Sequence, residues 1–459
     1  MLDLVAESTR QNHEGIEAEN EKVAAMDDDN TIGLELVGRM TIIAFFVFGT
    51  LSYFAYSLIL AGAQDILAGT WIQTSTVLIA NIFPKFLVSL IAPYFMKTVS
   101  YTVRISAVTL TYISGALMVA VAEQVHWKLI GIGLASFAFG VSEVTISALT
   151  SFYHGSCLTV YSAGTGTGFV IAPLYYLAMT TWACVSPQIT IAATTTLYLL
   201  IFVCYYLMDK KCLESPSPPG DCKHSGVEYT ALETKEDEDD HSKNSGNGTL
   251  SHCTKFQIIW QMLPDLLPLF IGWLTEYMII QSVVTTIAFP NAPFEPRDHY
   301  QYYIFAVTAG EVLGRSYLFA LSFIKEEWIE KVKFRPYLWI PVAIQVAMLV
   351  VLIFAAWYRY LTNVWFVLLI LFSSGLDIGG LYGTALTFFR GRFVEPYREF
   401  AMGYIIIALD AGELAAALIS LIIEPLLLKH CQMVSPNNTE VCFTRSTSLD
   451  RFNSFCSSR

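Results

Sequence analysis

The sequence predicts an all-α polytopic membrane protein with about eleven transmembrane helices in two bundles of six and five. Of its 459 residues, 54% are hydrophobic and only 14% are charged, whereas soluble domains carry about 25% charged residues. Apolar runs of roughly 18 residues or more recur along the chain, and each is long enough to cross a bilayer. A long hydrophilic interval near the middle divides these runs six plus five.

The predicted spans divide the chain into five parts. Residues 1–36 are expected to be a disordered cytosolic tail, 37–208 a six-helix bundle, and 209–257 a flexible acidic cytosolic linker. Residues 258–428 are expected to form a five-helix bundle and 429–459 a luminal tail. The spans should begin near Val37, Trp71, Thr102, Leu129, Leu158, Ile189, Met262, His299, Pro336, Asn363 and Ala401.

The distribution of lysine and arginine predicts the orientation, because cytosolic loops are rich in both. With the N-terminus in the cytosol, the opposite loops hold only Lys128, Arg297 and Arg359. Eleven spans then place the C-terminus in the lumen, where the sequon at Asn437 is expected to be glycosylated. Cys431 and Cys442 lie on the same side and are a candidate disulfide.

Composition and motifs exclude several classes of function. The net charge is −12, the acidic residues concentrate in two hydrophilic stretches, and no basic cluster suggests nucleic acid. The sequence shows no zinc spacing, nucleophile–base pair or phosphate-binding loop. It therefore predicts no enzyme and no cofactor.

Two bundles joined by a long cytosolic loop are the layout of the major facilitator superfamily, here one span short. Such transporters bind substrate between their halves near the middle of the membrane. Channels and receptors also have many spans, so span number alone does not establish transport.

Small residues line two neighbouring spans around Glu143. Gly133, Ser136 and Gly140 share a helix face with this carboxylate, and the next span opens with the small residues 162–168. The pattern indicates either tight packing of two helices or a solvated cavity at Glu143, because an unpaired carboxylate in a membrane costs several kcal/mol.

Two cations in the spans are candidate ligands for an anionic substrate. Lys85 follows Pro84, which can kink its helix, and the alternative is that it snorkels or pairs with a carboxylate. Arg315 lies one turn after Glu311. This spacing favours a self-neutralising structural pair, and the alternative is that a phosphodiester competes with Glu311 for the guanidinium.

Buried acids are candidate proton carriers or cavity residues. Glu276 could carry a proton if it is unpaired, Asp410 and Glu413 are two like charges at i and i+3, and Asp377 lies in a glycine-rich stretch expected to be irregular. The alternative for all four is that they pair with Lys85 or Arg315. Four other titratable residues carry weaker expectations: Asp65 as a loop cap or turn residue, and His126, His154 and His299 as solvated residues near span ends.

The linker contains Tyr229-Thr230-Ala231-Leu232, which fits a tyrosine-based sorting signal: a tyrosine, two residues and a bulky apolar residue. A disordered cytosolic loop is where such a signal is accessible, so sorting adaptors are candidate partners.

Short motifs follow one another along residues 37–428: Gln64–Leu67, Ser142–Thr145, Ser151–Tyr153, Ser162–Gly166, Ser186–Gln188, Glu276–Tyr277 and Arg398–Met402. In order and spacing they resemble the battenin family of lysosomal membrane proteins. The resemblance implies a lysosomal or late endosomal location, a relation to the major facilitator superfamily, and a role in clearing glycerophosphodiesters. It also implies possible links to lysosomal pH and basic amino acid transport.

Two features depart from that family. Battenin-like chains often end in a prenylated cysteine, whereas this chain ends Cys456-Ser457-Ser458-Arg459, so prenylation is not expected. The family's lysine in span two lies one turn later, where this chain has Ser89. Lys85 keeps a charge on the same helix face, but no role is carried over to it.

The sequence and the resemblance together predict a lysosomal transporter that works by alternating access. It would export a glycerophosphodiester or similar small polar anion to the cytosol, with protons as the candidate coupling ion. Lys85 and Arg315 would bind the phosphate, with Glu143 and Glu276 beside them. The alternatives are a non-transporting lysosomal regulator or scaffold of pH homeostasis and trafficking, and a basic amino acid transporter.

Overall fold

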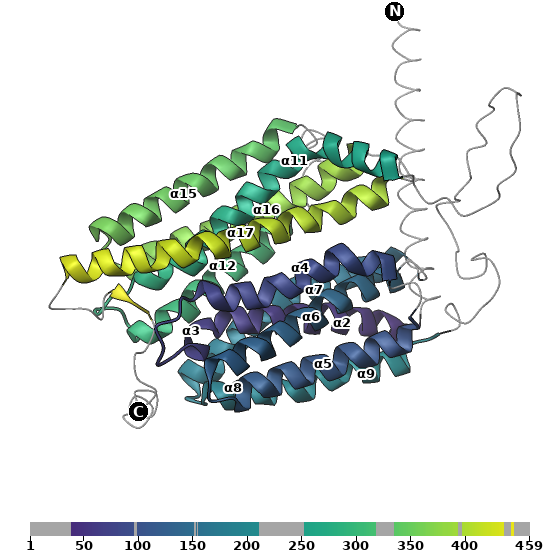
Figure 1. The fold of residues 1–459 in the computed structure, drawn as a ribbon, viewed down its shortest axis with the longest axis horizontal. Helices are drawn as coiled ribbons and strands as arrows, with labels where there is room; N and C mark the ends of the chain where they lie inside the picture. The colour runs from purple at the N-terminus through teal and green to yellow at the C-terminus, as the bar shows by residue number, and fades with distance from the viewer. Residues whose placement is uncertain are drawn as a thin grey trace, which may run out of the picture.

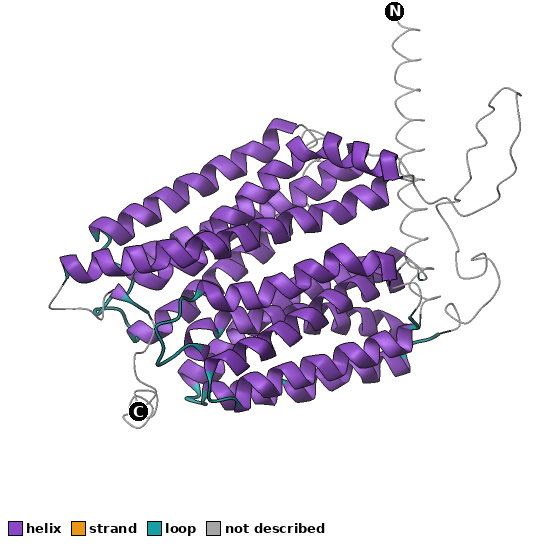
Figure 2. Cartoon of the chain, viewed as in Figure 1, coloured by secondary structure: helices purple, strands orange, loops and turns teal. Residues whose placement is uncertain are grey.

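The computed structural model describes residues 38–95, 99–150, 153, 155–210, 252–317, 335–392, 397–435 and 442–444. They form helices joined by loops, and the long helices lie in two groups, one from each half of the chain (Figures 1 and 2). Tyr229, Leu232, Asn437 and His154 lie outside the described residues, so the expectations for them stay predictions.

The N-terminal group holds six membrane-length elements. The fifth ends in a π-helical turn, η2 (Ala178–Trp182), and the sixth consists of two consecutive helices, α8 and α9. The helices are α2 (Arg39–Ala61), the short α3 (Ala63–Ile66), α4 (Ser75–Phe95), α5 (Tyr101–Val121), α6 (Val125–Thr150), α7 (Gly155–Leu177), α8 (Pro187–Ala193) and α9 (Thr195–Leu207).

Among its described residues, the C-terminal group holds five long helices and several short ones. Three short elements, η3 (Ile279–Val283), η4 (Val284–Thr286) and η5 (Pro296–Asp298), lie between the first two long helices, and η6 (Arg335–Leu338) precedes the third. The long helices are α11 (His252–Met278), α12 (His299–Arg315), α15 (Trp339–Tyr358), α16 (Val364–Arg392) and α17 (Tyr397–Val434).

The predicted spans correspond to these helices. Among the described residues, eight helical segments are long and apolar enough to cross a membrane. The other three, α4, α7 and α12, are shorter or more polar, and they carry Lys85, a run of glycine and threonine, and the Glu311–Arg315 pair. The helix α11 begins ten residues before the predicted span start at Met262, but its apolar membrane-length segment begins at Trp260, close to that prediction.

Each group packs within itself, and two helix pairs join the groups. In the N-terminal group α2 packs on α7, and α6 lies between α4 and α5; in the C-terminal group α12 packs on α16 and α11 on α17. Between the groups, α4 packs on α17 and α7 on α12. Large apolar side chains on the outer surface, such as Leu110 and Leu369, are 67% and 62% exposed, as expected where lipid replaces water.

Glycines set the closest helix contacts. A Cβ atom built on Gly164 of α7 would lie 2.3 Å from the carbonyl oxygen of Phe46 on α2, far inside contact distance. The pair α12–α16 is packed in the same way, since a Cβ on Gly375 would lie 1.9 Å from the carbonyl oxygen of Val307. The stretch around Asp377 was expected to be irregular, but α16 continues through it, and its glycines serve this close packing instead.

The small-residue face predicted on α6 receives α4. Ser136 Oγ accepts a hydrogen bond of 3.1 Å from the backbone N–H of Lys85. A Cβ on Gly140 would lie 3.2 Å from the Cα of Lys85. Tight packing is therefore confirmed, and it places Lys85 against the helix that carries Glu143.

The predicted disulfide between Cys431 and Cys442 is present, with the two Cα atoms 5.6 Å apart. It connects the end of α17 to residues 442–444, of which Thr444 is buried. Thr444 Oγ1 donates to Gln64 Oε1 of α3 at 2.7 Å, and its backbone N–H donates to the carbonyl oxygen of Thr285 at 3.0 Å. The C-terminal segment thus contacts both halves.

We expect Gly164→Ala to destabilise the protein, because its new methyl group would overlap the backbone of α2. Overpacking of this kind costs about 1–3 kcal/mol, which should lower the melting temperature of the detergent-purified protein. Gly166→Ala is the matched control on the same helix, since its Cβ would meet no atom within 4 Å. Equal melting temperatures for the two variants would show that α2 and α7 do not pack this closely.

Candidate functional site

Lys85 on α4 pairs with two carboxylates where the halves meet. Its Nζ lies 3.0 Å from Asp410 Oδ1 on α17 and 3.6 Å from Glu143 Oε2 on α6. All three side chains are at most 10% exposed. Of the two alternatives to substrate binding, the structure shows pairing and not snorkelling.

Aromatic side chains complete the surroundings of this ion pair. The Lys85 ammonium lies 4.7 Å from the ring centre of Phe139, within cation–π range. Tyr53 OH donates a 2.9 Å hydrogen bond to Glu143 Oε1. Asp410 Oδ2 has no hydrogen-bond partner in the structure, so one acceptor position beside the ammonium stays unused.

A second polar link crosses the interface one helix turn further along α17. Tyr56 OH on α2 donates 2.8 Å to Glu413 Oε2 and lies 2.9 Å from the hydroxyl of Tyr277 on α11. Asp410 and Glu413, which lie at i and i+3 on α17, therefore have separate partners. Each partner lies in the opposite half, so both acids join the two bundles.

The predicted pair of Arg315 and Glu311 is present on α12. Arg315 Nε lies 3.1 Å from Glu311 Oε1, and Nη2 contacts the same oxygen. The guanidinium carbon lies 4.6 Å from the ring centre of Tyr382 and 5.7 Å from that of Phe169 on α7. Arg315 is thus a paired cation with aromatic rings of both halves beside it.

The remaining acids differ in position. Glu276 on α11 is 2% exposed, and its Oε1 accepts no hydrogen bond. Asp377 lies apart from the Lys85 ion pair and lines a cavity of about 540 Å³ between α12, α15 and α16. The structure therefore does not bring Asp377 together with Lys85, Glu143 and Asp410.

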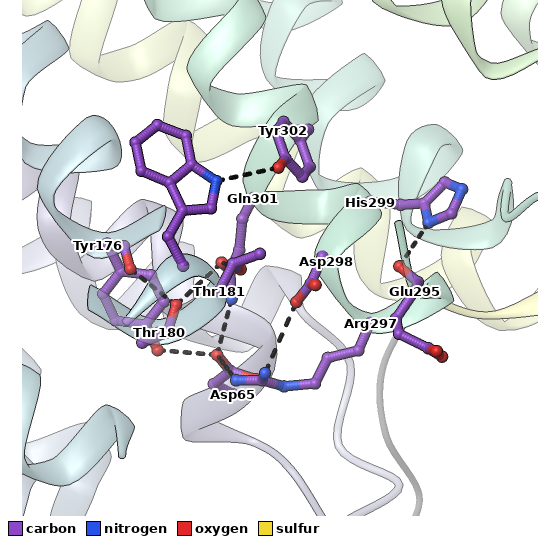
Figure 3. Close-up of polar contacts among 11 residues, drawn as sticks. Asp65, Tyr176, Thr180, Thr181, Glu295, Arg297, Asp298, His299, Gln301 and Tyr302 are labelled. Atoms are coloured by element: carbon purple, nitrogen blue, oxygen red, sulfur yellow. Dashed lines mark hydrogen bonds and ion pairs between the residues drawn. The ribbon is translucent and has the colours of Figure 1, made fainter. Parts of the chain in front are cut away.

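A polar cluster at the predicted luminal end was missed by the sequence reading (Figure 3). Asp65 accepts from Arg297 Nε at 3.0 Å and from Nη2 at 2.8 Å, a bidentate pair that joins α3 to η5. Gln301 Nε2 and Tyr176 OH donate to the same carboxylate at 3.0 and 2.9 Å. The expectation that Asp65 caps a helix or turn was wrong, because its carboxylate joins the two halves.

Further contacts extend this luminal-end cluster. Gln301 Oε1 on α12 accepts from Thr180 Oγ1 and Thr181 Oγ1 of η2 at 3.0 and 2.9 Å. Elsewhere at the same end, Glu424 of α17 accepts from the N–H and the hydroxyl of Thr74, both at 2.7 Å. Together with Thr444, these residues close the predicted luminal end with polar contacts between the halves.

Two signals for this cluster were present in the sequence. Arg297 is one of only three basic residues in the predicted luminal loops, and Asp65 belongs to the first quoted motif. Neither signal predicts that Asp65 pairs with Arg297, because the two residues are 232 positions apart in the sequence. Among the described residues, no group of three or more His, Cys, Asp or Glu side chains could hold a metal ion.

Removing the ammonium of Lys85 should destabilise the protein, because Asp410 and Glu143 would face each other without a cation. We expect Lys85→Met to cost about 3–5 kcal/mol, the usual loss for breaking a buried pair. Lys85→Met combined with Asp410→Asn should recover part of it, as seen in the melting temperature. Additive losses in the double variant would show that the two side chains do not interact.

Asp298, in the loop before α12, should make stability depend on pH. Burial raises the pKa of its carboxyl group from the usual 3.8 to about 6. The folded protein therefore binds this proton more tightly than the unfolded chain does, and stability should fall as pH rises from about 4 to 6, by on the order of 2–3 kcal/mol.

Melting temperatures of the wild type and of Asp298→Asn, measured from pH 4 to pH 7, check this prediction. The difference between the two proteins isolates Asp298 from other titrating groups. Glu295→Gln, at an exposed neighbouring position, is the control and should follow the wild type. A difference that does not change with pH would show that Asp298 titrates normally.

The arrangement of the helices is similar to that of solved transporter structures. The structure resembles a bacterial homologue of the human lysosomal transporter Spinster, solved in an inward-facing and occupied conformation, with a TM-score of 0.55, 12% identity and coverage of 86% and 83% of the two chains. The same homologue in its unoccupied conformation gives a TM-score of 0.53 at 15% identity, over 86% and 84%. The fold is therefore that of a major-facilitator-like membrane protein.

Sequence comparisons identify the family. Protein BTN1 of Yarrowia lipolytica is 30% identical over 385 residues, covering 83% of this chain and 93% of its own. Battenin of the dog, Canis lupus familiaris, is 27% identical over 351 residues, covering 76% of each chain. The family model described as CLN3 protein matches residues 43–430. The chain belongs to the CLN3, or battenin, family.

Proposed function

We propose that this protein is a secondary transporter that moves a small polar anion from lysosomal lumen to cytosol by alternating access. The observation that carries the proposal is the Lys85–Asp410–Glu143 ion pair, buried at the interface of the two bundles. Buried intramembrane charges are costly, and in membrane proteins they commonly mark substrate or ion pathways. The fold supports transport, since it is shared with a homologue of a transporter.

The chemistry of the interface suits an anion that carries a phosphodiester. Arg315 presents a planar guanidinium that donates two hydrogen bonds to two oxygens of such a group. Among the described residues, Glu311 is the one carboxylate that forms an ion pair with Arg315. Aromatic rings of both halves lie beside the guanidinium. A glycerophosphodiester that displaces Glu311 would therefore contact both bundles.

Coupling to protons is the second part of the proposal. Glu276 and Asp410 each have a buried carboxylate oxygen without a hydrogen bond. A proton on either group would reduce the cost of burial when the halves move apart. Proton binding and substrate binding would then change the charge of the same interface.

Uptake of labelled glycerophosphocholine into proteoliposomes, with and without a pH gradient, tests the proposal. We expect saturable uptake that responds to the gradient and is lost at least tenfold in Arg315→Ala. Arg39→Ala is the matched control, because Arg39 is exposed at the start of α2. Uptake at the same rate with and without the gradient would show that transport is not coupled to protons.

One set of results would contradict transport. Folded, inserted protein without saturable uptake, in which Glu143→Gln and Asp410→Asn leave cellular function intact, would favour a regulator or scaffold. A scaffold has no need for buried charges between its two halves.

A further inference from the structure

A cavity of about 500 Å³ lies at the predicted luminal end and is formed by both halves of the chain. The N-terminal half contributes Trp182 at the end of η2. The C-terminal half contributes the segment before α12, the start of α12 and the start of α16. These three segments supply the aromatic and acidic residues that line the cavity: Phe294, Glu295, Asp298, Tyr302 and Trp365.

The aromatic rings of the cavity are held together. Trp182 Nε1 donates to Tyr302 OH at 3.2 Å, across the two halves. The rings of Phe294 and Tyr302 lie 4.3 Å apart between centres. Trp182 and Trp365 are 56% and 59% exposed, so much of their ring surface is free to contact a ligand or lipid.

The carboxylates of the cavity outnumber the cations beside them. Asp298 is 1% exposed, and its Oδ1 accepts no hydrogen bond although it lies 3.6 Å from Arg297 Nη1. Arg297 directs its Nε and Nη2 to Asp65 instead (Figure 3). Glu295 adds a further carboxylate on the exposed rim. One guanidinium is thus shared by two aspartates, and the cavity keeps a negative charge.

We propose that this cavity binds an ammonium group of the choline type. Aromatic faces combined with a carboxylate are the usual recognition of a quaternary ammonium, whose charge is spread over apolar methyl groups. Aromatic residues at a membrane surface also form interfacial belts, but a belt does not explain the buried Asp298 carboxylate that lines the same cavity. Lys85 and Arg315, the cations proposed to bind the phosphate, do not line this cavity.

The ligand would touch both halves, and this has a conformational consequence. Trp182 belongs to one bundle and the other named residues to the second. A ligand shifts an equilibrium toward the state that it binds more tightly. An ammonium in this cavity therefore stabilises the arrangement in which the luminal end is closed.

Equilibrium dialysis of radiolabelled choline against the full chain in phosphatidylglycerol nanodiscs tests the site. The measurement is made at pH 7.5, above the pKa of about 6 of Asp298. We expect saturable binding of choline and none of its uncharged isostere, 3,3-dimethylbutanol. Trp182→Leu and Glu295→Gln should each weaken binding, about tenfold for the tryptophan.

Trp127→Leu is the matched control, since Trp127 is an exposed tryptophan at the same end, next to His126 and outside the cavity. It should bind choline like the wild type. Glu295 is exposed, so Glu295→Gln reports on the site even if variants at the buried Asp298 fail to fold. Equal binding of choline and its isostere, equal loss in Trp127→Leu, or no saturable binding overturns the proposal.

Nanodiscs made of phosphatidylcholine distinguish two sources of the ammonium. If choline binds there as tightly as in phosphatidylglycerol, the ligand is a free solute. If the phosphatidylcholine abolishes choline binding, the lipid headgroup fills the cavity. Both results support an ammonium site and assign its occupant.

Discussion

The pairing of Lys85 with Asp410 and Glu143 constrains the rest of the structure. An ammonium in a membrane protein needs counter-charges, because lipid supplies none. Here one counter-charge is on α6 of the same half and the other on α17 of the opposite half. The two bundles therefore meet closely at α4 and α17. The close α4–α6 contact at Gly140 and Ser136 in turn holds Lys85 in place.

Contacts within a half and contacts between halves use different chemistry. Within each half, glycines let backbones touch, as between Gly164 and α2 or Gly375 and α12, and such contacts have no alternative partners. Between halves, the central links are ion pairs and tyrosine hydrogen bonds, among them Lys85–Asp410 and Tyr56–Glu413. Polar contacts of this kind can exchange partners with a substrate, a proton or water. Alternating access requires two rigid bundles that rotate against each other, and contacts between them that can change partners.

The sequence predicted what depends on local periodicity. Hydropathy located the spans, i and i+4 spacing predicted the Glu311–Arg315 pair, and small residues on one face predicted the packing of α6. It offered Asp410 only as one of four acids that could pair with Lys85 or Arg315, and it gave Asp65 no partner, because Asp410 and Arg297 are 325 and 232 positions away. Asp377 shows a different failure. Its glycine-rich stretch was expected to be irregular, whereas α16 is continuous there and the glycines serve close packing.

The two sets of links between the halves differ in how they can be broken. At the predicted luminal end, Asp65 and Arg297 lie beside a cavity that opens at the end of the bundle, and separation would expose both charges to water. Water could then replace the four hydrogen bonds that the Asp65 carboxylate accepts. Lys85 and Asp410 lie on midspan positions, where a lost partner leaves a buried charge. At the luminal end water can therefore replace the broken polar contacts, whereas rearrangement at the centre needs a replacement charge. That requirement couples movement of the bundles to binding of an anion or a proton.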